Sequence, residues 1–188
     1  IPVGYYKTMH NPEVDWCYKT EKDETMANRS IPYPRGKTLG GSSSINGLLY
    51  IRGQEQDYNI WRQLGNKGWS WKDVLPYFIK SESQERGKNE YHGDKGPLSV
   101  SDPRIKLDLL EKFMDAAEEK GIPKVDDFNK GDNFGCGYFQ VTEKNGLRCR
   151  AAVGYLNPIK KRVNLKIETN CHVQKINFEG TKAVSVSF

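Results

Sequence analysis

The spacing of hydrophobic residues along the chain predicts several short helices. Residues 54–64 and 105–120 repeat apolar side chains at three- and four-residue intervals, which is typical of a helix with one apolar face. Between them, Ser70 and Asp73 have the spacing of a capping box, which predicts a second helix that continues to Lys80. Helices of this length need other elements to cover their apolar faces.

The helix predicted over 105–120 carries a continuous apolar stripe. Core packing accounts for such a stripe without any ligand, and Gly121 is placed to end the helix. The regions around the helices are predicted to be irregular, because residues 1–35 contain four prolines and residues 81–96 are charged and contain glycine. The stripe consists of Leu110, Phe113, Met114 and Ala117.

The end of the chain alternates apolar and polar residues as strands do. Apolar residues alternate near Leu165, a second run covers 172–178, and a third leads to Phe188. Glu179 and Gly180 are placed to turn the chain between the last two runs. Residues 163–188 are therefore predicted to form a three-stranded antiparallel ribbon.

A glycine-rich segment from Gly36 to Gly53 carries the clearest chemical signal. Gly40 and Gly41 allow the main chain to approach a ligand closely and adopt positive φ at little cost, and three serines follow them. A helix N-terminus after these glycines would offer N–H groups to a phosphate. The alternative is a flexible Gly/Ser linker. An apolar run with Asn46 inside it follows the serines, which argues against a linker.

The same segment resembles the first signature of the glucose–methanol–choline (GMC) flavin oxidoreductases. The likeness continues through Asp57-Tyr58, Gly68-Trp69-Ser70, Gly96-Pro97-Leu98 and Gly146-x-Arg148, covers essentially the whole chain, and is greatest for the insect glucose dehydrogenase-like branch. The signature residues are Gly36-Lys37-x-Leu39-Gly40-Gly41-Ser42-Ser43-x-Ile45-Asn46-x-x-x-Tyr50-x-x-Gly53.

The resemblance implies an internal piece of a larger enzyme. Such enzymes open with a βαβ unit carrying G-x-G-x-x-G, and the nearest approach here, Gly135-Cys136-Gly137, lacks the third glycine and the strand–turn–helix context. Their catalytic histidine lies beyond this segment. Residues 1–188 are thus interpreted as a partial FAD-binding region with part of the substrate domain: an α+β piece of an α/β parent, with short helices and a C-terminal β ribbon.

The resemblance also assigns residues to FAD. The serines and glycines of the loop are placed near the pyrophosphate and ribityl chain, Asn46 and the following backbone along the isoalloxazine, and Val173 at the adenine. Ile45 stands where some relatives attach the flavin through histidine, so the flavin is expected to be held non-covalently, and Arg150 stands where relatives usually place serine. The expected cofactor-binding residues are Gly40, Gly41, Ser42, Ser43, Asn46, Gly47, Leu49 and Val173.

The implied reaction is FAD-dependent oxidation of the CH–OH group of an alcohol or sugar, with no catalytic residue inside this segment. The alternative is a short, non-catalytic binding or interaction module of the same fold. A G-x-G-x-x-G unit upstream and a late histidine downstream in the parent sequence would favour the enzyme.

Composition excludes several other classes. The net charge of +5 comes from basic residues dispersed among acidic ones, and no motif of a nucleic-acid module is present. No apolar run reaches the roughly 18–20 residues that span a bilayer. The four cysteines and three histidines lack metal-ligand spacing, and free thiols in a core are the favoured state. No compartment is assigned, although Asn28-Arg29-Ser30 and the even cysteine count leave a secreted location open.

Overall fold

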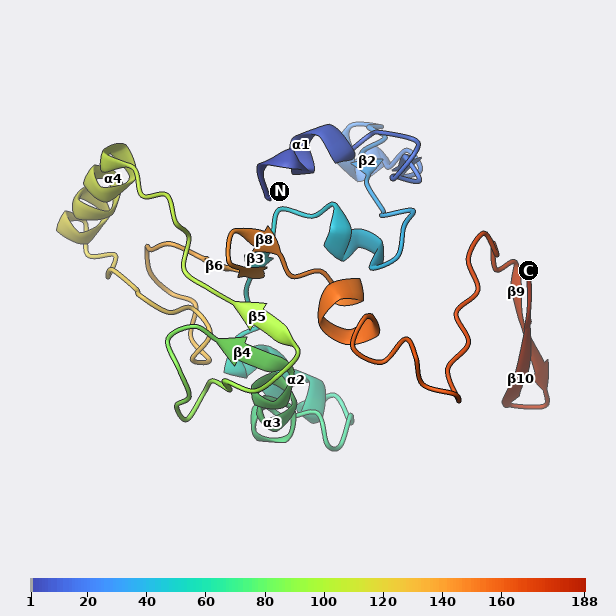
Figure 1. Ribbon diagram of the computed structural model, residues 1–188. Helices are drawn as coiled ribbons and strands as arrows, with labels where there is room; N and C mark the ends of the chain where they lie inside the picture. The colour runs from blue at the N-terminus through green and yellow to red at the C-terminus, as the bar shows by residue number, and fades with distance from the viewer. Residues whose placement is uncertain (1) are drawn as a thin grey trace. The chain divides into compact units, whose positions relative to one another are not determined.

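The computed structural model describes residues 2–188. Its contacts divide the chain into two units, and the boundary falls between Leu156 and Asn157 in the sequence. Figure 1 shows short elements joined by long loops. The α-helices are α1 (Tyr5–Thr8), α2 (Glu55–Gln63), α3 (Trp71–Ser81) and α4 (Asp108–Glu119). Single turns of other helix types are the 3₁₀ turns η1 (Pro2–Gly4), η2 (Glu24–Met26) and η3 (Gly41–Ser44), and the π turn η4 (Ala152–Leu156).

The strands pair two by two. The β1–β2, β3–β6, β7–β8 and β9–β10 pairs are antiparallel, whereas β4 and β5 are parallel. The strands are β1 (Tyr18–Lys19), β2 (Pro32–Tyr33), β3 (Leu49–Tyr50), β4 (Glu82–Gln84), β5 (Leu98–Val100), β6 (Gln140–Val141), β7 (Glu143–Lys144), β8 (Leu147–Arg148), β9 (Lys175–Glu179) and β10 (Lys182–Ser187).

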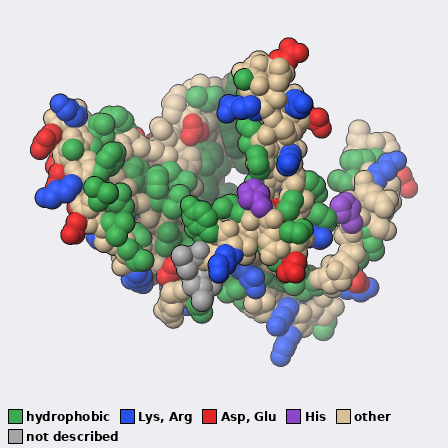
Figure 2. Space-filling model, turned by 90° about the horizontal axis from the view of Figure 1, so that it is seen from above, with side chains coloured by type: hydrophobic (Ala, Val, Ile, Leu, Met, Phe, Trp, Pro, Cys, Tyr) green, Lys and Arg blue, Asp and Glu red, His purple; other side chains and the backbone are tan. Residues whose placement is uncertain are grey.

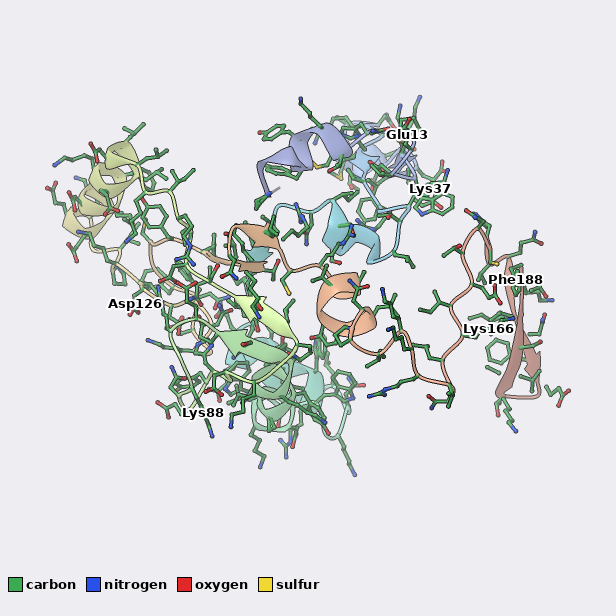
Figure 3. The ribbon with its side chains drawn as sticks, in the orientation of Figure 1. Glu13, Lys37, Lys88, Asp126, Lys166 and Phe188 are labelled. Atoms are coloured by element: carbon green, nitrogen blue, oxygen red, sulfur yellow. The ribbon has the colours of Figure 1, made fainter. Side chains whose placement is uncertain are left out.

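The first two predicted long helices are confirmed, and they pack on each other through aromatic rings. The Tyr58 ring of α2 lies 5.7 Å from the Trp71 ring and 5.8 Å from the Phe78 ring of α3. The predicted capping box is present, since the Asp73 carboxylate accepts hydrogen bonds from the Ser70 backbone N–H and hydroxyl. Figure 3 shows side chains gathered densely where this helix pair lies beside β4 and β5.

The helix α4 forms as predicted, but its apolar stripe is not packed into a core. Leu110 and Phe113 are exposed, and no residue of α4 is buried in the described chain. Gly121 ends the helix with φ +82°, as expected. The prediction of core packing is therefore wrong for Leu110 and Phe113, whereas Met114 and Ala117 are half-buried.

Two further expectations need correction. Residues 82–84, expected within a loop, form the buried strand β4, because their polar side chains bond to one another instead of to water. The second unit contains only the β9–β10 hairpin: the residues around Leu165 do not form a third strand. Both faces of the hairpin are largely exposed, so no packing partner organises the segment before it.

The interior of the described chain is unusually polar. Eleven polar or charged residues are buried against seven apolar ones. Large apolar side chains remain exposed on α2, α4 and the C-terminal hairpin, and Figure 2 shows hydrophobic side chains over much of the face that it presents. The apolar core consists of Ile45, Leu48, Trp71, Val100, Phe128, Cys149 and Ala152.

Candidate functional site

The glycine-rich segment forms a tight, well-connected loop. Gly40 and Gly41 have φ values of +92° and +54°, which confirms the expected left-handed backbone. A Cβ atom at Gly36 would lie 2.2 Å from the Gly41 carbonyl oxygen, so only glycine fits there. The loop leads into the single 3₁₀ turn η3 (Gly41–Ser44), so the expected helix N-terminus is one turn long. These contacts exclude a flexible linker.

The serine hydroxyls mainly hold the loop in shape. Ser43 Oγ donates to the Gly40 carbonyl and accepts the Ala151 backbone N–H at 2.9 Å, and Ser44 Oγ donates to the Leu39 carbonyl at 3.0 Å. Ser42 Oγ accepts the Gly36 N–H at 3.2 Å. Within the described chain, Ser42 is the one of the three whose hydroxyl proton has no protein acceptor.

The Asn46 side chain fixes the turn that follows. Its Oδ1 accepts the Leu48 backbone N–H at 3.2 Å and a hydrogen bond from the Arg148 guanidinium. Leu48 adopts a φ of +70°, a conformation that this side-chain bond helps to hold. Among the described residues, neither the Asn46 amide nitrogen nor the Gly47 backbone N–H donates to a protein acceptor. Both donors lie at exposed positions.

The glycine-rich segment has an anchoring side with buried side chains and an open side with exposed residues. Ile45 and Leu48 are buried, and the Leu48 carbonyl accepts the Thr142 backbone N–H at 2.9 Å. Asn46, Gly47 and Leu49 are exposed. The predicted residues from Gly40 to Leu49 therefore lie on one loop and the start of β3, and the Asn46 and Gly47 donors are exposed while Ser42 is half-buried.

Arg148, which the sequence marked only as part of a motif, closes the loop from a distant segment. It ends β8, which pairs with β7 through a turn in which Asn145 and Gly146 both have positive φ. The guanidinium donates to the Ser43 carbonyl at 3.2 Å as well as to Asn46. Burial and the nearby Arg150 charge lower the pKa of Arg148. The side chain is thus committed to the loop.

Arg150 lies at the start of η4. Its carbonyl accepts the Val153 and Gly154 backbone N–H groups at 2.9 and 3.0 Å, which makes it the N-cap residue of that turn. Its guanidinium has no ion-pair partner among the described residues. A serine at this position could also have capped the turn through its hydroxyl.

Val173 lies outside the unit that contains the glycine-rich loop. It belongs to the second unit, is exposed, and lies just before β9 instead of within a strand. The next residue, Gln174, donates its backbone N–H to Ser187 at 2.8 Å and extends the hairpin. Its expected contact with adenine stays a prediction.

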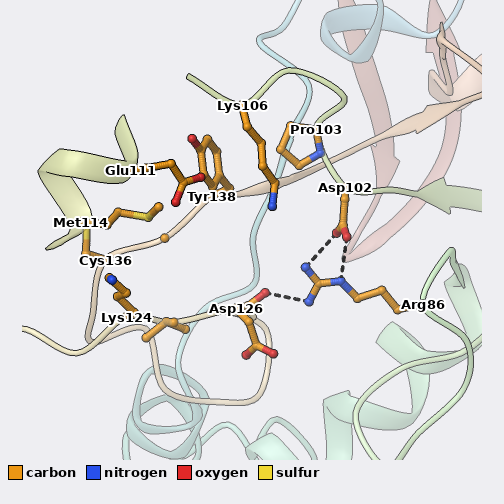
Figure 4. Close-up of a pocket in the computed structure, with 12 residues that line it drawn as sticks. Arg86, Asp102, Pro103, Lys106, Glu111, Met114, Lys124, Asp126, Cys136 and Tyr138 are labelled. Carbon is orange, nitrogen blue, oxygen red and sulfur yellow. Dashed lines mark hydrogen bonds and ion pairs between the residues drawn. The ribbon is translucent and has the colours of Figure 1, made fainter. Parts of the chain in front are cut away.

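A separate cavity of about 290 Å³ lies between α4 and residues 102–106 and 124–138 (Figure 4). Arg86 crosses one end, donating to the Asp102 carboxylate at 3.0 Å and to the Asp126 carbonyl at 2.7 Å. None of the residues expected to bind cofactor lines this cavity.

Sequence reasoning missed a buried cluster of charges near the loop. His92, one of the three histidines without metal-ligand spacing, places Nδ1 2.9 Å from Glu82 Oε2 and Nε2 2.9 Å from Asp127 Oδ2. Glu82 also pairs with the Arg52 guanidinium. The three partners are far apart in sequence, so spacing gave no signal of the cluster.

Residues 2–188 contain all four cysteines of the chain. Cys17, Cys136, Cys149 and Cys171 are free thiols, and of these only Cys149 is buried, so the expected core location holds at one position. No described helix combines the length and apolar character needed to cross a membrane. Within the same residues, no group of three or more His, Cys, Asp or Glu side chains is arranged to hold a metal ion.

These features define a rigid glycine-rich loop with an open row of donors, a class of site suited to a phosphate-bearing cofactor. The GMC oxidoreductase family model matches residues 18–188, and the chain belongs to this family. It is 41% identical over its whole length to an alcohol dehydrogenase [acceptor] of Pseudomonas putida and 37% identical to mitochondrial choline dehydrogenase of Homo sapiens. The chain spans about a third of these relatives, 34% and 32% of their lengths.

Solved structures agree with the family. A pyridoxine 4-oxidase from Mesorbium loti superposes with a TM-score of 0.90 at 29% identity, covering 98% of this chain and 37% of that one. An FAD-dependent oxidoreductase from Chaetomium thermophilum gives a TM-score of 0.84 at 30% identity, with 94% and 33% covered. FAD is the cofactor of this family, and a Cβ atom at Gly41 or Gly47 would meet nothing within 4 Å, so the loop leaves room for a ligand there.

Proposed function

We propose that this chain supplies the flavin-binding loop of an FAD-dependent oxidoreductase that acts on the CH–OH group of an alcohol or sugar. The observation that carries the proposal is the set of uncommitted donors, Ser42 Oγ, Asn46 Nδ2 and Gly47 N–H, on a loop that the Ser43 and Ser44 hydroxyls and Asn46 Oδ1 hold in shape. A preorganised loop of this kind binds a ligand without a large ordering cost.

Each residue of the glycine-rich loop has a role in this proposal. Gly40, Gly41 and Ser42 face the pyrophosphate and ribityl chain, and Asn46 with the backbone of Gly47–Leu49 lies along the ring. When bound, FAD supplies the hydride acceptor for alcohol oxidation. Ile45 is buried and has no nucleophile, so the flavin is held non-covalently. The base that takes the hydroxyl proton comes from outside these 188 residues.

The finer assignment is to the insect glucose dehydrogenase-like branch, with a sugar or related alcohol as substrate. The supporting residues are Pro34-Arg35-Gly36-Lys37 and the aromatic segment that follows Asp57. A panel of sugars, choline and simple alcohols, tested on enzyme reassembled with the remaining two thirds of a relative, separates the branches. A preference for choline would contradict the assignment to the insect glucose dehydrogenase-like branch.

Asn46→Leu tests the site directly. Because the variant removes the turn-fixing acceptor and the Nδ2 donor, FAD affinity is expected to fall between a few-fold and about a hundredfold, as one hydrogen bond and one stranded partner imply. The measurement is flavin fluorescence during titration of the 188-residue chain, repeated in reassembled full-length enzyme. Asn11→Leu is the matched control, since Asn11 Oδ1 also accepts a backbone N–H two residues on. Equal affinities in the folded Asn46→Leu variant and wild type would remove Asn46 from the site.

The 188-residue chain alone is expected to reduce no dye acceptor with alcohol or sugar, even with added FAD. It lacks the family's dinucleotide-binding unit and catalytic histidine, so cofactor binding and turnover are separable here. Measurable alcohol-dependent dye reduction by the purified chain would contradict this separation of cofactor binding from turnover. FAD binding without turnover in the reassembled enzyme would instead favour a non-catalytic binding module.

A further inference from the structure

Four charged side chains form a buried group next to strand β3, which follows the glycine-rich loop. Arg52 and Glu82 pair with side chains 1% and 0% exposed, and His92 and Asp127 pair with side chains 2% and 5% exposed. His92 also contacts Glu82, so the four are connected in one group. Charges this deeply buried are stable only when they are paired and hydrogen-bonded. We call this group the quartet.

The geometry sets the protonation of His92. Its Nδ1 lies 3.0 and 2.9 Å from the two Glu82 oxygens, and its Nε2 lies 2.9 Å from an Asp127 oxygen. An ionised carboxylate only accepts hydrogen bonds, whereas a neutral imidazole has one nitrogen that cannot donate. Both nitrogens must therefore carry protons. The quartet then holds two positive and two negative charges and is neutral as a whole.

The groups around His92 come from each packed element. Glu82 and the Gln84 amide lie on β4, Arg52 and the Tyr50 hydroxyl come from β3 and the residues after it, and Asp127 is approached by Lys130 at 3.9 Å. Burial lowers the pKa of His92, but hydrogen bonds and charges of Asp127 and Glu82 raise it overall to about 9. Burial raises the pKa of Tyr50, so its titration lies above that of His92.

Arg52 belongs to the glycine-rich segment, and Asn129 makes a second connection between the quartet and this segment. The Asp127 carboxylate accepts the Asn129 backbone N–H at 2.8 Å. Asn129 in turn accepts the Arg52 backbone N–H at 2.7 Å and donates to the Tyr50 carbonyl at 3.4 Å. Strand β3 therefore has its backbone fixed on one side by the quartet, and it directly follows the Asn46 turn.

We propose that His92 is a positioning residue, a permanent imidazolium at neutral pH whose charge holds β3 and thereby the open side of the flavin loop in place. The link between His92 and flavin binding rests on the proposed function, whereas the charge of the imidazole ring rests on geometry alone. His92 touches neither cofactor nor substrate and acts through Asp127 and Asn129.

The first test follows the imidazole itself. The chain has three histidines, so replacing His10 and His172 by glutamine leaves one ring to observe by ¹⁵N NMR. The expected result is a doubly protonated ring at pH 8 that loses its proton near pH 9. A ring that is neutral at pH 8 in the folded chain overturns the proposal, with or without any flavin measurement.

The second test measures stability and FAD affinity against pH. A raised folded pKa gives stability that is complete below the ordinary value of 6.5 and is lost as pH rises through about 9. The unfolding equilibrium constant should therefore rise by up to on the order of a hundredfold between pH 7 and 10, and FAD affinity should fall with the same midpoint. His92→Gln lacks this pH step. His92→Gln/Asp127→Asn, which restores neutrality, recovers part of the stability lost in the single variant.

The outcomes separate the two proposals. If stability falls near pH 9 while FAD affinity stays constant, the quartet is structural and His92 has no positioning role. If wild-type chain and reassembled enzyme bind no FAD at pH 7, the proposed function fails, and the NMR titration still decides the state of His92. A double variant no more stable than His92→Gln would contradict the charge balance.

Discussion

Arg150 stands where the family resemblance leads us to expect a serine, and its contacts show what an arginine does at this position. Arg150 caps η4 with its carbonyl only, and its charge lies near Arg148 without an ion-pair partner among the described residues. Both effects are unfavourable: Ser43 Oγ accepts the Ala151 N–H, but Arg150 itself offers no side-chain acceptor to the turn, and two cations repel.

Arg150→Ser is therefore expected to stabilise the chain. A serine N-cap contributes about 1 kcal/mol, and removal of the repulsion acts in the same direction. Urea unfolding of wild type, Arg150→Ser and Arg150→Ala measures this, because the alanine variant removes the charge without adding a cap. Equal midpoints for the serine and alanine variants would show that the hydroxyl does not cap η4.

Single residues also show how far the sequence could predict the site. The glycines and Asn46 were predictable, because positive φ and a polar side chain in an apolar run are local signals. The contacts of Arg148 and the quartet were not, since Arg52 and Glu82 meet across 30 residues and Asn46 and Arg148 across 102. Long-range pairs of charged residues leave no periodic trace in a sequence.

At the scale of elements, local signals were reliable and burial was not. The capping box and terminal glycine correctly marked α3 and α4, because these interactions lie within one helical turn. Whether a stripe or strand is buried depends on what covers it. The α4 stripe has the expected pattern, yet Leu110 and Phe113 are exposed, and the segment around Leu165 has the expected pattern without forming a strand.

Two phenylalanines test that distinction. Phe113 on α4 is 65% exposed, whereas Phe128 is 6% exposed and packs 4.8 Å from the Phe139 ring. Phe113→Ala should lower the free energy of unfolding by less than about 1 kcal/mol, and Phe128→Ala should lower it by roughly 3–5 kcal/mol. Denaturant unfolding of both variants is the measurement. Similar losses would mean that the α4 stripe is buried in solution.

At the scale of the molecule, thiol chemistry reports the state of the whole chain. All four thiols should react after denaturation, and in the native chain exposed Cys17 should react first and buried Cys149 last. Thiol counting with a chromogenic disulfide reagent gives both results, and Cys17→Ser should remove the fast phase. Zero free thiols after denaturation would indicate a disulfide-stabilised, secreted protein.

The loop that binds the flavin in our proposal also imposes an order on folding. Ser43 and Asn46 are held by Arg148 and Ala151, partners 102 to 108 positions later in the chain. At a synthesis rate of about 5–20 residues per second, those partners emerge from the ribosome roughly 5–20 s after the loop itself. During that interval the loop cannot form these long-range hydrogen bonds. In our proposal, flavin capture is therefore a late event in biogenesis, because the loop's hydrogen bonds to Arg148 and Ala151 form only after those residues have been synthesised.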